Sequence, residues 1–508
     1  MAKVKQNSFV LKGAIGADDI ESWSGKLSVV EGQTGKPQSC IVLDCFDQKI
    51  RKSGRVLLET GGELLLYCGK GDALKQPARR DGDFVSDLAE GPVKAAIDGM
   101  FPLRCLLPVA SGTVVLRRLA VVDGGKNTHA RLHLQHFVDG CPPFTLARLQ
   151  SLRGYGQAAK ELRRILLGLG GRPADAKTIY PLLAPGVAPY VAKPKIPLTG
   201  NESAFGAATD IIRSYFAVAR QNEAGAAAGL DTEFLHDYRV ALRKIRSVLS
   251  LFKRVFSAAA TARLKKSFSR LMAPTGRLRD LDVYLLERQS YFDLLPPTLH
   301  TGLTVIFDAF EAERAVLQAA LAKRFRSAAY KRETGELQVE FEHPQSLLRG
   351  PKGTVPAHTY AQMLIWKRYR KICRIAARIS GSTPDEEVHK LRINCKKLRY
   401  LMEFFAPLFP PKDCKLLLKP LKLLQDNLGL INDYSVQQVS LREFVRSSPA
   451  MKGAMGLEAA QSIGALIAIL HQRQSAERAR VAESFSTFNS SQTQDRFRFL
   501  FHCKLPQS

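Results

Sequence analysis

The chain has 508 residues, a hydrophobic content of 45%, and 75 Lys and Arg against 47 Asp and Glu, which gives a net charge of +28. This composition is that of a soluble globular protein, the apolar runs are too short for a membrane span, and the length predicts two or three domains. The positive charge attracts polyanions, whether nucleic acid, anionic membrane or phosphate polymer, so the arrangement of the cations must decide among them.

The N-terminus and the cysteines bear on the compartment and on metal chemistry. MAKVKQNSFVLKG lacks the apolar core of a signal peptide, so we expect a cytoplasmic protein. The nine cysteines form no C-x-x-C pair, and their odd number and irregular spacing indicate reduced thiols. No Walker loop or Gly-rich dinucleotide motif is present, so we expect no cofactor and no metal.

The first 200 residues are predicted to be rich in β-strands. RVLLET and ELLLY flank Gly61-Gly62, and Asp123-Gly124-Gly125 separates two further alternating runs, as in β-hairpins. Residues 145–168 read as a helix. The proline-rich passage that follows, up to about residue 200, is interpreted as a linker with little helix of its own.

From residue 201 to about residue 505 the strand signals almost disappear. Amphipathic helical patterns follow one another, separated by short breaks rich in proline and glycine. This pattern predicts an all-α domain of helical bundles with short connections.

An internal repeat lies within the helical part. HDYRVALRKIR at 236–246 aligns without a gap with HKLRINCKKLR at 389–399, an offset of 153 residues, and the same offset aligns GRLRDLDV at 276–283 with GLINDYSV at 429–436. Two distant segments in one register predict a duplicated unit, with copies at about 203–330 and 356–490.

The repeated helices place their cations in stripes. On a helical wheel the apolar residues of each copy occupy one side and the basic residues the other, except that Glu403 falls among the cations of the second copy. The predicted ligand-binding cations and histidines are His236, Arg239, Arg243, Lys244, Arg246, Arg263, Lys266 and Arg270 in the first copy, and Lys367, Lys371, Arg374, His389, Arg392, Lys396, Lys397, Arg399, Lys412, Lys415, Lys419 and Lys422 in the second.

Two interpretations of these stripes are open: ordinary solvated faces, or a surface for an anionic ligand. Solvated faces usually mix signs, because Glu–Lys pairs at i, i+4 stabilise a helix by a few tenths of a kcal/mol and like charges cost a similar amount. Nearly unmixed stripes that occur in duplicate therefore favour an anionic ligand. His236 and His389 have no partner at metal-ligand spacing, so we interpret them as hydrogen-bond donors or as further cations beside a phosphate.

Residues 201–505 resemble the CHAD family, the conserved histidine α-helical domain. The resemblance rests on LHDYRVALRKIRSVL, VHKLRINCKKLRYLMEFF and the segments GRLRDLDV and GLINDYSV that follow them. It implies two four-helix bundles related by pseudo-twofold symmetry. It also implies a central channel, lined by basic residues, that binds inorganic polyphosphate, and an association with polyphosphate granules.

Residues 1–200 resemble a degenerate copy of the CYTH family, the triphosphate tunnel barrel. Where the family has E-x-E-x-K, SFVLK offers Ser8, Val10 and Lys12, so both metal-binding carboxylates are missing. The family's later acidic strand corresponds to ARLHLQH, which lacks its glutamates. The motif that follows E-x-E-x-K in the family corresponds to VLDCFDQKIRKSGRVLLET. Asp44, Asp47, Ile50, Gly54 and Leu57 fit this motif, but Leu58 and Thr60 replace two phosphate-binding arginines.

The expected fold class is thus α+β in two domains, with an antiparallel β-barrel-like domain over 1–200 and an all-α domain over 201–505. We predict a non-enzymatic protein that binds inorganic polyphosphate, with no membrane partner, and the sequence leaves the oligomeric state open. One alternative is a triphosphate-processing enzyme, which needs metal-binding carboxylates that the expected positions lack. The other is a nucleic-acid-binding protein, which is disfavoured because Tyr238, Phe252 and Phe405 fall on the apolar side and Tyr400 is the main exception.

Overall fold

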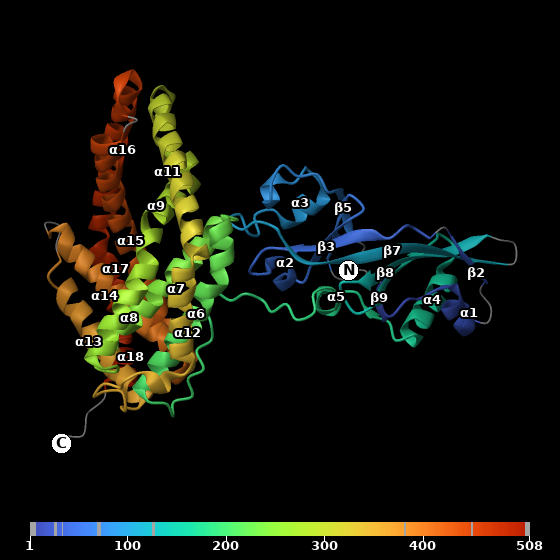
Figure 1. Cartoon of the computed structure of the whole chain (residues 1–508), viewed down its shortest axis with the longest axis horizontal. Coiled ribbons are helices and arrows are strands. Elements are labelled where there is room, and N and C mark those ends of the chain that lie inside the picture. The colour runs from blue at the N-terminus through green and yellow to red at the C-terminus, as the bar shows by residue number, and fades with distance from the viewer. Residues whose placement is uncertain are drawn as a thin grey trace. The chain divides into compact units, whose positions relative to one another are not determined.

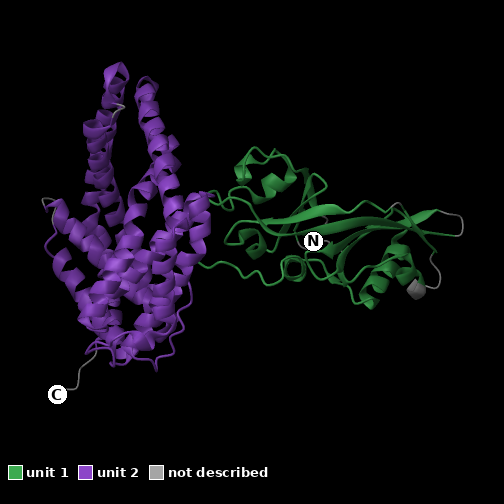
Figure 2. Ribbon diagram, viewed as in Figure 1, with its two compact units in different colours: residues 1–191 green, residues 192–508 purple. Residues whose placement is uncertain are grey.

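The computed structural model describes residues 7–24, 28–32, 34–68, 73–123, 127–379, 383–448 and 451–502. The chain divides into two compact units, residues 1–191 and 192–508, which are coloured separately in Figure 2. The first unit is a curled antiparallel sheet with short helices, and the second is helical (Figure 1). The expected order, a β-rich domain followed by an all-α domain, is confirmed.

The sheet of the first unit is an open half-barrel. Its strands run in the order β10-β1-β9-β8-β7-β3-β4-β5-β6, and β2 pairs with β7 outside this path. The predicted hairpin at Gly61-Gly62 joins β4 to β5, and both glycines have the positive φ that such a turn requires (57° and 76°). The turn predicted at 123–125 lies partly outside the described residues. The strands are β1 (Ser8–Lys12), β2 (Ser28–Glu31), β3 (Gln38–Asp44), β4 (Val56–Thr60), β5 (Glu63–Tyr67), β6 (Leu74–Pro77), β7 (Leu107–Val122), β8 (Thr128–Asp139), β9 (Phe144–Ser151) and β10 (Arg172–Pro173).

Each face of the sheet is covered by a separate apolar core, because side chains alternate between the two faces of a strand. On one face, Phe9 and Leu132 pack with Leu162 of α4 (Gly156–Gly168). On the other, Val10 and Leu58 pack with α5 (Ala176–Leu183). The remaining helices of this unit are α1 (Ala17–Ser24), α2 (Lys49–Lys52) and α3 (Pro92–Ile97).

Two predictions for this unit are wrong. Of the helix expected over 145–168, residues 145–151 belong to strand β9, which pairs with both β1 and β8, and 156–168 form helix α4. Leu146 and Leu149 of β9 lie in the cores on opposite faces, and a strand buried on both sides lacks the polar alternation that marks an exposed strand. The expected linker contains α5, whose N-terminus is capped by the Asp175 carboxylate, which accepts the Thr178 amide at 3.0 Å.

The second unit consists of helices joined by short connections. They are α6 (Ala204–Ala228), α7 (Thr232–Leu251), α8 (Ala258–Met272), α9 (Gly276–Leu286), α10 (Arg288–Phe292), α11 (His300–Arg326), α12 (Ala328–Glu342), α13 (Ala357–Ala376), α14 (Asp385–Phe404), α15 (Pro411–Ser447), α16 (Gly453–Ala479), α17 (Val481–Phe488) and α18 (Ser491–Phe501).

The sequence repeat is visible in the helix boundaries. α7 and α14 both have 20 residues, and α13 and α14 begin 153 residues after α6 and α7. The Ala204 amide donates to the Val355 carbonyl at 2.7 Å, and the Ala357 amide donates to the Glu202 carbonyl at 2.9 Å. These two hydrogen bonds exchange equivalent positions of the two copies. Such reciprocity is the mark of a twofold contact.

The copies differ after the conserved pair of helices. The first copy is interrupted by a 3-10 turn, η2 (Ala273–Thr275), which contains Pro274 and separates α8 from α9. The equivalent residues of the second copy contain no proline, and α15 continues as one helix of 37 residues. α15 packs with α11 and α16 around a shared apolar core, and α11 and α16 extend beyond the other helices in Figure 1.

One helical stretch, Gly453–Phe488, is long and apolar enough to cross a membrane by length and composition alone, which the apolar runs of the sequence did not indicate. Within it, Ile463, Leu466 and Leu470 of α16 are buried in the core shared with α11. A single such helix is weak evidence for a membrane span, because core helices of bundles pass the same test.

Candidate functional site

α7 and α14 carry the predicted site, and each is anchored by its apolar face. Tyr238, Leu242 and Ile245 of α7 are buried, as are Leu391 and Leu398 of α14. The N-terminus of α7 is capped by Asp231, whose carboxylate accepts the amides of Glu233 and Phe234 at 3.0 and 3.2 Å. The two helices contact each other, so their polar faces lie in the same part of the domain.

Cations from the two copies come together where α7 meets α14. The pKa of Lys396 is lowered to about 8, first by burial and then by the charges of Arg392 and Arg243. Burial also lowers the pKa of Arg392, and Arg243 adds to this effect. Arg243 belongs to the first copy and Lys396 and Arg392 to the second, so the two stripes meet. We call Arg239, Arg243, Arg392 and Lys396 the cation cluster.

The segments that follow the repeated helices hold the two half-buried arginines of this cluster. Arg239 Nη1 donates to the Thr275 hydroxyl at 2.6 Å, and that hydroxyl donates to the Met272 carbonyl. Arg392 Nη2 lies 3.4 Å from Asp433 Oδ1. Asp280 and Asp433 are equivalent in the repeat, and each opposes the lowering of the pKa of its arginine by burial. The sequence gave no signal for Thr275.

Lys244, a predicted ligand residue, is instead buried between the two copies. Its ammonium donates to the Glu403 carboxylate and lies 4.5 Å from the ring centroid of Tyr400. Glu403 also accepts from Arg399 Nε at 2.7 Å. Burial raises the pKa of Glu403, but Lys244 and Arg399 outweigh it and hold that pKa below its usual value. Burial lowers the pKa of Lys244, although Glu403 opposes this. We take the pair as ionised, because the carboxylate is held by two cations.

The two repeated histidines lie at equivalent places on these helices. His389 is exposed, and its Nδ1 lies 2.8 Å from Asn432 Oδ1, which is an arrangement in which the ring donates. His236 is half-buried on α7. Across the described ranges, no three His, Cys, Asp or Glu side chains come together in a way that could hold a metal.

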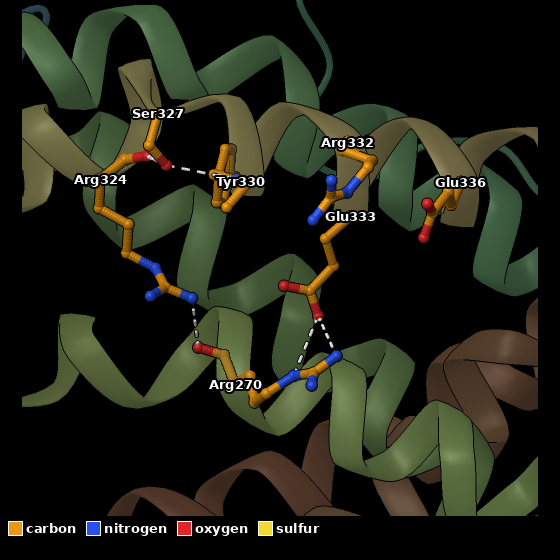
Figure 3. Close-up of a pocket in the computed structure, with 8 residues that line it drawn as sticks. Arg270, Arg324, Ser327, Tyr330, Arg332, Glu333 and Glu336 are labelled. Atoms are coloured by element: carbon orange, nitrogen blue, oxygen red, sulfur yellow. Dashed lines mark hydrogen bonds and ion pairs between the residues drawn. The ribbon is translucent and has the colours of Figure 1, made fainter.

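Two of the three predicted cations of α8 meet carboxylates of the protein itself, whereas Lys266 is exposed. Arg263 makes a two-pronged ion pair with Glu340, and Arg270 Nη2 lies 2.8 Å from Glu333 Oε1, both acids belonging to α12. Figure 3 shows Arg270 and Glu333 at a cavity of about 360 Å³, where Arg324 also contributes to the wall. Part of this stripe is therefore neutralised within the fold.

The stripes of α13 and α15 differ from that of α8. All seven of their predicted cations are exposed, and none forms an ion pair within the part of the chain that the structure describes. α13 and α15 both contact α14, so these cations belong to the same bundle as Arg392 and Lys396. The seven residues are Lys367, Lys371 and Arg374 on α13, and Lys412, Lys415, Lys419 and Lys422 on α15.

The helices that carry the repeated histidines and the cation cluster lie within a stretch of the chain that matches a known family. Residues 210–442 match the family model of the CHAD domain, so this part of the chain is a CHAD domain and the predicted family is confirmed. The crystal structure of the CHAD domain from the plant Ricinus communis is similar, with a TM-score of 0.50 and 24% identity over 60% of this chain and 98% of that one.

Two further comparisons were made, with solved structures and with curated proteins. PptA from Streptomyces chartreusis has a TM-score of 0.45 and 12% identity, over 56% of this chain and 99% of that chain. No curated protein matched the chain. The half-barrel of the first unit is consistent with a CYTH-like tunnel domain.

The residues of the half-barrel do not fit the metal that the tunnel family uses. At the two positions of the missing carboxylates, Ser8 is buried and Val10 belongs to the apolar core beneath α5. Leu58 is in the same core and Thr60 is buried. One neutral hydroxyl and one alkyl side chain do not replace the two carboxylates that would hold Mg²⁺ there.

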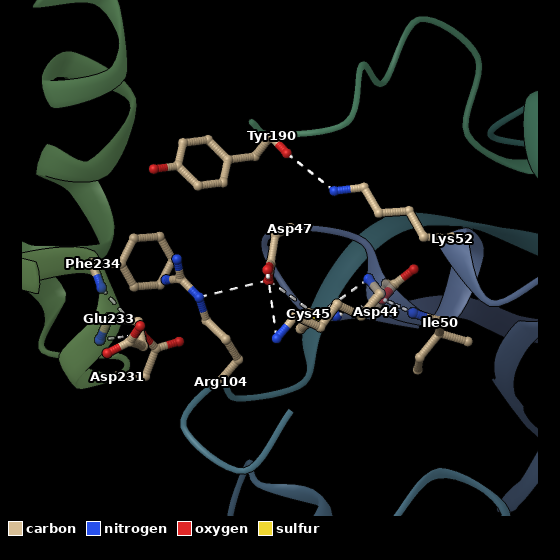
Figure 4. A network of polar contacts seen from close by, with 11 residues as sticks. Asp44, Cys45, Asp47, Ile50, Lys52, Arg104, Tyr190, Asp231, Glu233 and Phe234 are labelled. Atoms are coloured by element: carbon tan, nitrogen blue, oxygen red, sulfur yellow. Dashed lines mark hydrogen bonds and ion pairs between the residues drawn. The ribbon is translucent and has the colours of Figure 1, made fainter. Parts of the chain in front are cut away.

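The aspartates that the motif retains have structural partners. Asp44 is fully buried, and its carboxylate accepts the amides of Cys45, Ile50 and Arg51 at 2.8 to 3.0 Å, which holds the start of α2 (Figure 4). Asp47 lies 3.6 Å from Arg104 in the same view. The kept part of the motif therefore shapes the turn after β3.

Proposed function

We propose that the CHAD domain binds inorganic polyphosphate, without cofactor or metal, through the cation cluster and the exposed stripes of α13 and α15. The observation that carries this proposal is the meeting of Arg243 with Arg392 and Lys396 from the other copy. Like charges held this close repel one another in the free protein. A polyanion offsets that repulsion and makes charge-assisted hydrogen bonds with the same groups.

The burial of the aromatic rings of the repeated helices supports a phosphate chain over nucleic acid. Tyr238, Phe252 and Phe405 are no more than 2% exposed, and Tyr400 is half-buried beside Lys244. Proteins that bind single-stranded nucleic acid place aromatic rings beside their cations, because each stacked base contributes about 1–3 kcal/mol. Polyphosphate has charge but no bases, so cations alone suit it. The same binding would recruit the protein to cytoplasmic polyphosphate granules.

The test is charge reversal at equivalent positions, Arg239→Glu with Arg392→Glu. Each charge-assisted contact contributes about 1.5–3 kcal/mol before screening, so we expect at least a tenfold loss of affinity at about 0.15 M salt. The dependence of affinity on salt should also become shallower, because fewer counterions are released. The matched control is Arg442→Glu with Arg446→Glu, two exposed residues near the end of α15, which should change affinity little. A folded double variant that binds as tightly as the parent contradicts the proposal.

We also propose that binding is not followed by hydrolysis. The positions that supply metal ligands in the tunnel family hold Ser8 and Val10. We expect the purified full chain to release no phosphate from triphosphate or polyphosphate in the presence of Mg²⁺ or Mn²⁺. Metal-dependent release that Lys12→Ala abolishes would contradict this expectation.

A further inference from the structure

One exposed face of α15 carries a row of leucines. Leu416, Leu423 and Leu430 are 55%, 55% and 42% exposed. They are spaced seven residues apart, so they form nearly one line along the helix, about 21 Å long at 1.5 Å per residue. Single exposed leucines are common on protein surfaces and need no explanation. A row at heptad spacing is instead the pattern of a helix that packs against another helix.

A row of charged side chains runs beside the leucines on the same face. Its members are also spaced seven residues apart and are all exposed: Lys412, Lys419, Asp426 and Asp433. Each lies one helical turn, three or four residues, from a leucine of the row. The two lysines precede Leu423 and the two aspartates follow it. The face therefore has a positive half and a negative half along one apolar row.

This change of sign makes the face complementary to itself in one orientation. If two copies pack α15 against α15 antiparallel, with the twofold axis at Leu423, that leucine meets its own equivalent and Leu416 meets Leu430 of the second copy. Lys419 and Asp426 lie four residues before and three residues after Leu423, so each comes opposite the other in the second copy. The outer pair of the row, eleven residues before and ten residues after Leu423, is matched in the same way. Each contact is thus made twice, as in an isologous interface.

The same change of sign argues against other occupants of this face. In a parallel pair, Lys419 would lie beside Lys419 of the second copy and Asp426 beside Asp426, so that every charged position would meet a like charge. An anionic membrane surface or an acidic segment would fit the lysines but would repel the aspartates. Charge pairs of this kind beside an apolar seam set the partner and the orientation of packed helices.

The neighbouring contacts leave room for this pairing. Asp433 lies 3.4 Å from Arg392 of its own chain, but its side chain is 61% exposed, and a carboxylate can accept from two cations. Lys415 and Lys422 each precede a leucine of the row by one residue. On the helical wheel they fall beyond the charged row, on the side away from the leucines, so they lie at the solvent edge of the seam.

We infer that this face of α15 binds a second copy of the chain, as an antiparallel dimer with its twofold axis at Leu423. The inference goes beyond the proposed function and does not rest on it, because the leucines and aspartates have no part in the proposed polyphosphate site. Lys412 and Lys419 belong to both surfaces, so the dimer is tested without polyphosphate. One pair of packed helices is a small interface, below about 1,200 Å² in total, so the dimer should form at micromolar concentrations and exchange rapidly.

The experiment is sedimentation velocity of the full chain from about 1 to 100 μM, a range that covers weak specific interfaces. We expect monomer and dimer in a concentration-dependent equilibrium. Leu423→Glu should weaken the dimer at least tenfold, because it places two carboxylates against each other on the axis. The matched control, Leu457→Glu, changes a leucine of α16 that is 64% exposed and should leave the equilibrium unchanged.

Charge exchange tests the antiparallel register. Lys419→Asp alone and Asp426→Lys alone should each weaken the dimer at least threefold, because each places like charges opposite one another. An equimolar mixture of these two variants should recover dimerisation, since the carboxylate introduced at position 419 then meets the ammonium introduced at position 426. All of these positions are exposed, and circular dichroism checks that the variants fold. A monomer at every concentration, a dimer that Leu423→Glu leaves unchanged, or a mixture that does not recover overturns the inference.

Discussion

Lys396 is the member of the cation cluster whose protonation should respond most to a bound anion, because its pKa is near neutral pH. Its pKa is about 8 because burial disfavours the ammonium and because Arg392 and Arg243 repel it, while Asp433 only partly offsets this. The free protein therefore begins to lose this charge just above neutral pH. A bound polyanion favours the ammonium, so it raises the pKa and binding takes up a proton where the free lysine is neutral.

We expect the affinity for polyphosphate to be highest below pH 8 and to fall as the pH rises through about 8. Lys396→Arg should remove this fall, because a guanidinium stays charged over the range. Calorimetry in two buffers of different ionisation enthalpy at pH 8.5 measures the proton directly. An affinity that is equally pH-dependent in Lys396→Arg, or no proton uptake by the parent, would exclude this role.

The fate of Lys244 shows which part of the site the sequence could predict. Wheel positions along a single helix placed Arg239, Arg243, Arg392 and Lys396 on polar faces, because helical periodicity is local. Lys244 is buried against Glu403, which lies 159 residues further along the sequence. A pattern within one helix cannot predict a contact between residues so far apart in the sequence. The sequence did show that Glu403 is the one acid among the cations of its helix. That exception was the only indication that a cation of the site would pair with a carboxylate of the protein itself.

At the scale of elements, the Lys244–Glu403 pair connects α7 to α14. Removing one partner of a buried ion pair leaves the other charge uncompensated, which typically costs about 3–5 kcal/mol. Because the Glu403 side chain is 24% exposed, we expect Glu403→Gln to lower the free energy of unfolding by about 3 kcal/mol, at the lower end of that range. Denaturant unfolding measures this, with the exposed Glu336→Gln as control. Equal stability of the two variants would mean that the pair does not join the copies.

The same pair predicts a dependence of stability on pH. The pKa of Glu403 is held below its usual value, so its contribution is complete above the unfolded pKa of about 4.3 and is lost as the pH falls through the folded pKa. Parent and Glu403→Gln should therefore differ in unfolding free energy at pH 6 and converge toward pH 3. A difference that is constant over this range would point to packing rather than charge.

The boundaries of helices could be predicted where the internal repeat gives two copies to compare. They could not be predicted where an element forms only through contacts with distant parts of the chain. The offset of 153 residues applies to the starts of α6 and α13 and to both ends of α7 and α14. β9 was mistaken for helix because it is buried on both faces, and α5 was missed because its proline-rich sequence becomes helical only against the core of the sheet. Local sequence propensity predicts neither the burial of β9 on both faces nor the packing of α5 against the sheet.

At the scale of the whole molecule, each of the two units has apolar clusters of its own. Four apolar clusters of described residues each lie within one unit: three cover the faces and end of the half-barrel, and one joins α9, α11, α15 and α16. The reciprocal hydrogen bonds of Ala204 and Ala357 close the helical unit on itself. A unit that contains its own core and closure contacts has what independent folding requires.

We therefore expect residues 192–508 expressed alone to fold and to bind polyphosphate within a factor of about three of the full chain, which is less than about 0.7 kcal/mol. Circular dichroism should show a helical spectrum without a strand contribution, and calorimetry should give the affinity. The fragment with Arg239→Glu and Arg392→Glu serves as the control, because it should fold equally and bind more weakly. Aggregation of the fragment would show that the half-barrel is needed for folding. A folded fragment that has lost affinity would show that the half-barrel takes part in polyphosphate binding.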